Sequence, residues 1–166
     1  MSLALRAATA LTLSLTAAAA QADFSLTILH VNDFHSRVEA INRFDSTCSA
    51  ADDAEGKCFG GLARLSTAVA DARAAAGNAP ILFLNAGDIF QGSLYYTTYK
   101  GLAEAELFNG IGVDAMALGN HEFDNGPETL AAFIDKVHFP VLSGNTWLGD
   151  EPALKGKTQG YLILDV

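Results

Sequence analysis

The sequence is poor in basic residues, and this scarcity argues against two kinds of partner. It holds 10 lysines and arginines against 19 aspartates and glutamates, a formal net charge of −9 at pH 7. An acidic surface of this kind repels nucleic acid and anionic lipid, so we expect neither as a partner. A small anionic substrate remains compatible with this charge, because two divalent cations would add about four positive charges locally and dominate the field of a site.

The sequence also lacks an apolar run of the roughly 20 residues that a transmembrane helix needs. Residues 1–6 form a short basic start, the fourteen residues 7–20 carry no charge, and Ala20-Gln21-Ala22 fits the small-residue rule for signal-peptide cleavage. A transmembrane anchor is the alternative, but fourteen residues are too few to span a bilayer. We therefore expect residues 1–22 to be a signal peptide and the mature protein to be secreted or periplasmic.

Cysteine is scarce as well, and its two copies stand close together. Cys48 and Cys58 have nine residues between them, in a segment rich in Ser, Asp, Gly and Ala. In an oxidising compartment this spacing predicts a local disulfide that closes a loop, with a free or intermolecular thiol as the alternative. A metal site is disfavoured, because cysteine ligand pairs usually stand two to four residues apart.

The remaining composition and the apolar pattern predict an α/β fold. Half of the residues are hydrophobic and 17% are charged, as in one globular domain with a sizeable core. Apolar runs predict strands at residues 26–31, 81–85, 115–118 and 141–142, with a last run at 161–166 that looks like a strand without a partner. Helical spacing predicts helices over residues 61–76, over 102–108, and from Pro127 to just before Pro140. Alternating strands and helices imply right-handed crossovers and a mainly parallel sheet.

Metal-type side chains follow three of the predicted strands. Asp33 and His35 come after the first strand, Asp88 after the second, and Asn120 and His121 after the third. Because ligands of open α/β sheets bind beyond the carboxyl ends of the strands, we expect these groups to converge in one crevice. Oxygen and nitrogen donors suit hard or borderline divalent cations rather than iron–sulfur or copper–thiolate chemistry. The sequence therefore predicts a metal-dependent enzyme.

Each of these residues also has a plainer interpretation. An aspartate at a strand end is commonly a turn former or a helix cap, so Asp33 or Asp88 taken alone would be weak support for a metal site. His121 could bind metal or act on substrate, and Asp124, three residues on, could orient its ring and favour the imidazolium. The alternative for that pair is an ordinary hydrogen bond at a helix start. We expect His30 and His138 to be structural or exposed.

Three segments taken together resemble the 5'-nucleotidase family of calcineurin-like metallophosphoesterases. They are residues 29–37 (LHVNDFHSR), 85–93 (NAGDIFQGS) and 115–126 (AMALGNHEFDNG), in the same order as in the family. The short cysteine loop running into residues 58–65, and residues 99–101, are especially similar to the branch of secreted and cell-surface 5'-nucleotidases. The resemblance covers nearly all of residues 23–166.

This resemblance implies a site and a fold. Asp33, His35 and Asp88 would hold one divalent ion, Asp88 would bridge to a second ion that Asn120 also binds, and zinc, manganese and magnesium are not distinguished. His121 and Asp124 match the catalytic dyad of the family. The implied fold is a four-layer α/β/β/α sandwich, cut here after its N-terminal βαβ units. Residues 23–166 would then be the N-terminal part of the catalytic domain, without its C-terminal part or the nucleotide-specificity domain.

The implied function is that of a secreted phosphomonoester hydrolase, which releases phosphate from nucleoside 5'-monophosphates. Alternatives on the same scaffold are a 2',3'-cyclic-nucleotide phosphodiesterase, a nucleotide-sugar hydrolase or a sulfur-ester hydrolase. A non-catalytic extracytoplasmic metal-binding module is the alternative from another class. The sequence assigns no substrate-binding residue and no oligomeric state, although Asn145, after the last predicted strand of the parallel set, is a candidate neighbour of the site.

Overall fold

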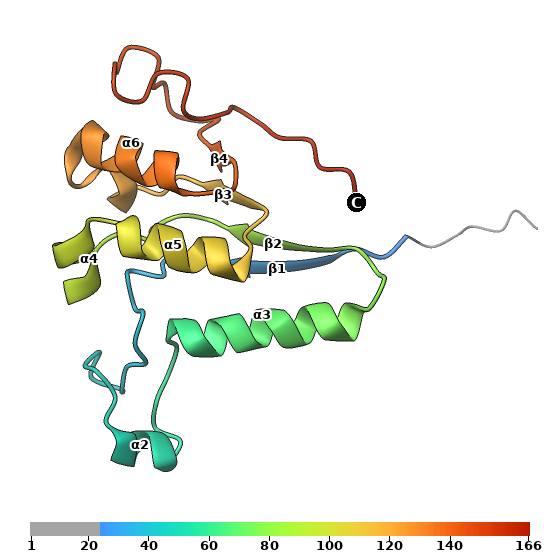
Figure 1. The fold of residues 1–166 in the computed structure, drawn as a ribbon, viewed down its shortest axis with the longest axis vertical. Coiled ribbons are helices and arrows are strands. Elements are labelled where there is room, and N and C mark those ends of the chain that lie inside the picture. Colours follow the sequence, from blue (N-terminus) through green and yellow to red (C-terminus); the bar gives the residue numbers. More distant parts are fainter. Residues whose placement is uncertain (1–23) are drawn as a thin grey trace, which may run out of the picture.

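A computed structural model of the chain describes residues 24–166, so the signal peptide expected over residues 1–22 lies outside the described residues. Within the described part, the strands form one parallel sheet in the order β1-β2-β3-β4 (Figure 1). The strands are β1 (Thr27–Val31), β2 (Ile81–Asn85), β3 (Ala115–Ala117) and β4 (Val141–Leu142). The prediction of an α/β fold with a parallel sheet is confirmed, and each strand lies within one residue of its predicted bounds.

Helices separate the strands along the chain. The three longest are α3 (Leu62–Ala76), α5 (Leu102–Ile111) and α6 (Gly126–Lys136), and all three were predicted from apolar spacing. Three short helices were not predicted: α2 (Ala50–Ala54), α4 (Leu94–Tyr99) and the 3-10 turn η1 (His121–Phe123). These are too short to show a helical period, and α2 and α4 begin instead at serine caps, where Ser49 and Ser93 accept hydrogen bonds from the first turn.

The topology places the main helices on one face of the sheet. Sequential parallel strands joined by right-handed crossovers put every connecting helix on the same side, and α5 contacts both α3 and α6. On that side Leu29, Phe83 and Met116 of successive strands pack into the main apolar core. Ile28 and His30 of β1 point to the opposite face and are exposed, as was expected for His30. Among the described residues the sheet thus has one helical layer, two of the four layers that were expected.

The last part of the chain departs from its prediction. Residues 161–166, expected to form a strand, contain no regular secondary structure, and Tyr161 and Ile163 are exposed. The sheet is instead extended at one point only, where Gln159 forms a parallel bridge with Leu142. A strand is stabilised by a neighbour that pairs with its backbone, and no described segment pairs with residues 161–166. No helix among residues 24–166 is long and apolar enough to span a bilayer.

The loop between β1 and α3 is closed by the predicted disulfide. Cys48 and Cys58 are bonded, with their Cα atoms 5.8 Å apart. The same loop is tied by isolated bridges from Ile41 to Thr47 and to Phe59. The cross-link therefore stabilises a segment that has little apolar core of its own.

Candidate metal centre

The loops that follow β1 and β2 lie side by side at the carboxyl end of the sheet. The backbone N–H of Asp33 donates to the carbonyl oxygen of Gly87 at 3.0 Å, and that of His35 donates to the carbonyl oxygen of Asp88 at 3.0 Å. These bonds continue the pairing of β1 with β2 beyond the strands. Asp33 and Asp88 consequently lie in neighbouring loops on the same edge of the molecule, as the sequence predicted.

Three predicted site residues bring ligand atoms together. One ligand atom from each of His35, Asp88 and His121 lies within 4.8 Å of the other two. Asp33 borders this group, because its Oδ1 is 3.6 Å from Nε2 of His35. Asn120 lies immediately before His121 in the loop after β3 and is exposed. The five residues proposed from three separate segments of sequence therefore belong to one region, although the tight trio contains His121 rather than Asp33.

The trio fits a divalent cation. Ligand atoms that share one ion at about 2.0–2.2 Å lie at most about 4.4 Å from one another. The separations in the trio, up to 4.8 Å, therefore require only a small side-chain movement to reach a common ion. Mixed imidazole and carboxylate donors suit zinc and similar ions, and additional carboxylate or amide oxygens also accommodate manganese or magnesium.

His121 and Asp124 form the predicted pair. Nδ1 of His121 lies 2.7 Å from Oδ2 of Asp124, which leaves Nε2 of the ring available for a ligand or a substrate. The hydrogen bond to Asp124 is the main cause that raises the pKa of His121 above its ordinary value. The same bond is the main cause that lowers the pKa of Asp124, and the nearby side-chain amide of Gln91 lowers it further.

Strained backbone is concentrated at this site. Seven non-glycine residues of the described chain have positive φ, and five of them lie at the site: Asp33 (50°), His35 (47°), Ser36 (53°), Asp88 (54°) and Gln91 (70°). A left-handed conformation costs roughly 1–2 kcal/mol for a residue with a side chain. Such conformations cluster at functional sites, where surrounding contacts hold them in place.

Glycines allow the β2 and β3 loops to touch. A Cβ added at Gly87 would lie 2.3 Å from the backbone nitrogen of Gly119, and one added at Gly119 would lie 2.2 Å from Oδ1 of Asp88. No side chain fits at either position without a shift. The close approach lets the backbone N–H of His121 donate to Oδ1 of Asp88 at 2.9 Å.

Two buried glutamates near the site were missed by the sequence analysis. Glu122 and Glu104 are both completely buried. Glu122 accepts hydrogen bonds from backbone N–H groups of the β2 and β3 loops, and Glu104 accepts one from the hydroxyl of Ser36, directly after His35. A single sequence carries no sign that an acidic residue in a loop or on a helix is buried, so only the position of Glu122 beside His121 could have drawn notice.

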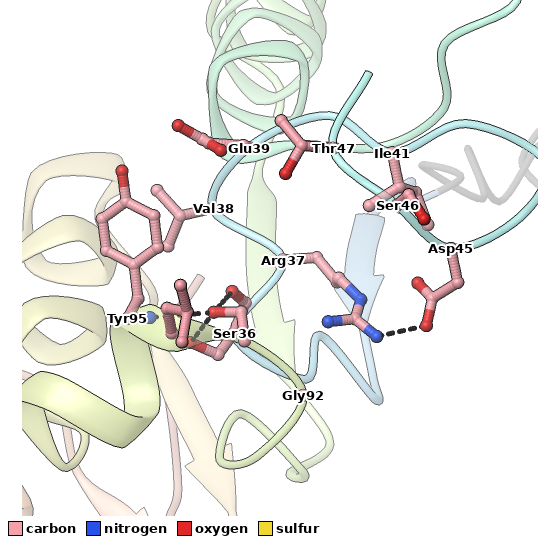
Figure 2. A pocket seen from close by; sticks show the side chains of 12 residues that line it. Ser36, Arg37, Val38, Glu39, Ile41, Asp45, Ser46, Thr47, Gly92 and Tyr95 are labelled. Carbon is pink, nitrogen blue, oxygen red and sulfur yellow. Dashed lines mark hydrogen bonds and ion pairs between the residues drawn. The ribbon is translucent and has the colours of Figure 1, made fainter. Parts of the chain in front are cut away.

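A cavity of about 440 Å³ lies beside the site, between the loop after β1 and the start of α4. Figure 2 shows Arg37 pointing across it to Asp45, with which it forms an ion pair, while Tyr95 stands on the other side. Its lining includes Ser36 and Gly92 but none of the trio His35, Asp88 and His121. Asn145, the candidate neighbour of the site, is exposed and accepts a hydrogen bond from Thr146, and His138 is exposed, within what was expected for it.

Comparison with known proteins is consistent with this geometry. Residues 26–165 match the calcineurin-like phosphoesterase family. A 5'-nucleotidase of Bos taurus is 48% identical over 123 residues, which are 74% of this chain and 20% of that protein. The crystal structure of a 5'-nucleotidase precursor from Thermus thermophilus superposes with a TM-score of 0.67 at 42% identity, over 81% of this chain and 25% of that one. The structure of an NAD nucleotidase from Haemophilus influenzae superposes with a TM-score of 0.71 at 30% identity, over 85% of this chain and 24% of that one.

The chain thus spans between a fifth and a quarter of the length of these relatives. The match nevertheless covers every strand of the sheet and all the residues of the candidate metal centre. This chain therefore belongs to the calcineurin-like phosphoesterase family.

Proposed function

We propose that this chain supplies the N-terminal half of the metal site of a phosphomonoester hydrolase that acts on nucleoside 5'-monophosphates. The observation that carries the proposal is the convergence of His35, Asp88 and His121, with Asp33 alongside, from the ends of three parallel strands. The similarity to proteins named 5'-nucleotidases supports the substrate class.

Asp33, His35 and Asp88 are the proposed ligands of one divalent ion, and Asp88 and Asn120 of a second. When bound, a pair of divalent ions supplies a nucleophilic water and neutralises charge on the phosphoryl group. Donors from the part of the protein beyond this chain would complete the coordination, because these residues alone leave positions open. The backbone N–H of His121 donates to one oxygen of Asp88 and so restricts the orientation of this carboxylate.

His121 lies with His35 and Asp88 in the trio, but we propose that it acts on the substrate and is not a ligand of either ion. Asp124 holds Nδ1 of the ring, so Nε2 is free to donate to a phosphoryl oxygen or to protonate the leaving oxygen. The raised pKa of His121 keeps the donating imidazolium present at a higher pH than an isolated imidazole would. The pair thereby contributes to electrostatic stabilisation of the transition state.

Replacing Asp88 with alanine in the protein that contains this chain tests the proposal. We expect loss of phosphate release from AMP, together with loss of bound metal measured by elemental analysis, because Asp88 is the proposed bridging ligand. The exposed Asp71 of α3 provides the control, and its replacement with alanine should leave both properties unchanged. Normal AMP hydrolysis by the Asp88→Ala variant would refute the assignment.

A second candidate substrate class is a dinucleotide or nucleotide sugar, favoured by the similarity to an NAD nucleotidase. Assays of NAD, a nucleotide sugar, AMP and 2',3'-cyclic AMP with the same protein separate these possibilities. A higher kcat/KM for NAD than for AMP would replace the leading proposal with this one.

We also propose that the protein is exported. The disulfide between Cys48 and Cys58 supports this, since disulfides persist in oxidising compartments. Sequencing the N-terminus of the mature protein should show Asp23 as its first residue, and a mature protein that retains Met1 would contradict export by cleavage.

A further inference from the structure

We propose that Glu122 is a positioning residue that holds two ligand-bearing loops together from beneath the metal site. These are the loop after β2, which carries Asp88, and the loop after β3, which carries Asn120 and His121. The inference rests on the proposed metal site for its functional meaning. Its structural part, that one buried carboxylate fixes both loops, stands on contacts that require no metal.

Both oxygens of Glu122 are engaged by backbone N–H groups. Oε2 accepts from Asp88 at 2.9 Å and from Gly119 at 2.7 Å, so a single oxygen joins the two loops. Oε1 accepts from Ile89 at 2.8 Å and from Phe90 at 3.3 Å. The carboxylate therefore fixes the position of the loop after β2 relative to the loop after β3, and also the backbone conformation of the loop after β2.

The backbone around Asp88 is built to receive an anion. Asp88 has a φ of 54°, and a left-handed residue beside right-handed or turn residues directs successive N–H groups into one concavity that binds negative charge. Here three consecutive N–H groups, from residues 88–90, meet the carboxylate of Glu122. Four N–H donors compensate for the burial of this charge, and they favour the strained conformation that presents the Asp88 side chain.

The contacts leave Glu122 no direct part in metal or substrate binding. A carboxylate offers about four lone-pair positions, and four N–H donors occupy them in a side chain with no exposed surface. A further hydrogen bond joins the two loops directly, since the Asp88 side chain in the loop after β2 accepts from the backbone N–H of His121 in the loop after β3. Glu122 thus acts on the site only through the loops that it holds.

Replacing Glu122 with glutamine tests this role, because the amide keeps the size of the side chain but turns one acceptor into a donor. At least one pair of N–H groups then loses its acceptor. In the metal-free protein we expect faster amide exchange at Asp88, Ile89, Phe90 and Gly119 by NMR, with β1 and α5 unchanged. Affinity for Mn²⁺ or Co²⁺, measured by competition with a chromophoric chelator, should fall about 10–100-fold, as when partners of metal ligands are lost.

Two controls separate positioning from general stability. Val69→Ala removes buried apolar contacts on α3, away from the site, and should lower the unfolding temperature while leaving metal affinity unchanged. Glu106→Gln makes the same chemical change at a position of α5 outside the buried set and should alter nothing. If Glu122→Gln does not fold, Glu122→Asp serves in the same measurements, because the shorter side chain cannot reach both loops.

The positioning role would be overturned if amide exchange at the four residues of Glu122→Gln were the same as in the wild-type protein. It would also be overturned if Val69→Ala, with the same loss of unfolding temperature as Glu122→Gln, lost as much metal affinity. Absence of metal binding by the wild-type protein, with the exchange result as expected, would instead contradict the proposed metal site and leave the loop-holding role intact. The failures of the two proposals are therefore distinguishable.

Discussion

At the scale of single residues, the two buried glutamates differ in how far hydrogen bonds compensate for their burial. Glu122 has four backbone donors around its carboxylate, whereas Oε2 of the equally buried Glu104 has no partner among the described residues. His121 and Asp124 are partly exposed and hold each other. Glu122 thus organises two loops, and the partly exposed pair of His121 and Asp124 is accessible to a substrate.

The coupling of His121 to Asp124 predicts a pH dependence. Because Asp124 is the main cause that raises the pKa of His121, replacing it with asparagine should lower that pKa toward the ordinary value of 6.5. NMR titration of the His121 ring in the metal-free protein measures the change, with His30 on the exposed sheet face as an internal control. An unchanged pKa of His121 in Asp124→Asn would contradict the coupling.

The pair of His121 and Asp124 also makes the stability of the fold depend on pH. Because the pKa of His121 is higher in the folded than in the unfolded state, the protonated ring stabilises the fold below pH 6.5. This stabilisation is lost as pH rises through the folded-state pKa. Because the pKa of Asp124 is lower in the folded than in the unfolded state, the ionised carboxylate stabilises the fold above pH 3.8. This stabilisation is lost as pH falls through the folded-state pKa. The pair therefore contributes most between pH 3.8 and 6.5. Asp124→Asn should flatten the stability profile measured by denaturant unfolding across this interval.

At the scale of secondary-structure elements, the loops that follow β2 and β3 are in close contact. Register pairs Asn85 with Met116 at the ends of these strands, and the glycines that follow, Gly87 and Gly119, leave no room for a side chain between the loops. Strand pairing thus sets the distance between loops, and glycine permits contact at that distance.

Replacing Gly119 with alanine should therefore disturb the site. The new Cβ would lie 2.2 Å from Oδ1 and 2.6 Å from the backbone nitrogen of Asp88, so the loop after β2 must shift. We expect weaker metal binding by at least about tenfold, as for other changes in the support of metal ligands.

Gly110 of α5 is the matched control for this change, because a Cβ there would meet nothing within 4 Å. Gly110→Ala should stabilise the helix by roughly 0.5–1 kcal/mol and leave metal affinity unchanged. Wild-type affinity in Gly119→Ala would show that the loops have more freedom than their packing indicates.

At the scale of the whole molecule, the sheet is covered by helices on one face and bears apolar side chains on the other. Ile28 is 54% exposed on the uncovered face, where Leu82 lies beside it in register. In the four-layer sandwich expected from the family, a second sheet covers this face.

Ile28→Ala in the protein that contains this chain tests that expectation. If a second sheet packs on Ile28, the free energy of unfolding should fall by about 2–5 kcal/mol, as for a buried isoleucine. Thr98→Ala, at an exposed position of α4, should change it by less than about 0.5 kcal/mol. A loss of less than about 1 kcal/mol for Ile28→Ala would mean that the face remains open to solvent, as it is here.

The sequence by itself determined the four paired strands, the long helices and the disulfide, and it predicted which polar residues lie at the end of the sheet. It did so because apolar periodicity is local, and because polar residues directly after buried strands must gather at one edge of a parallel sheet. The tertiary structure alone decided the burial of Glu104 and Glu122 and the irregular course of residues 161–166. The hydrogen bonds that Glu122 accepts from the β2 loop join residues 32 to 34 positions apart, and no local sequence pattern shows which distant backbone groups will surround a carboxylate.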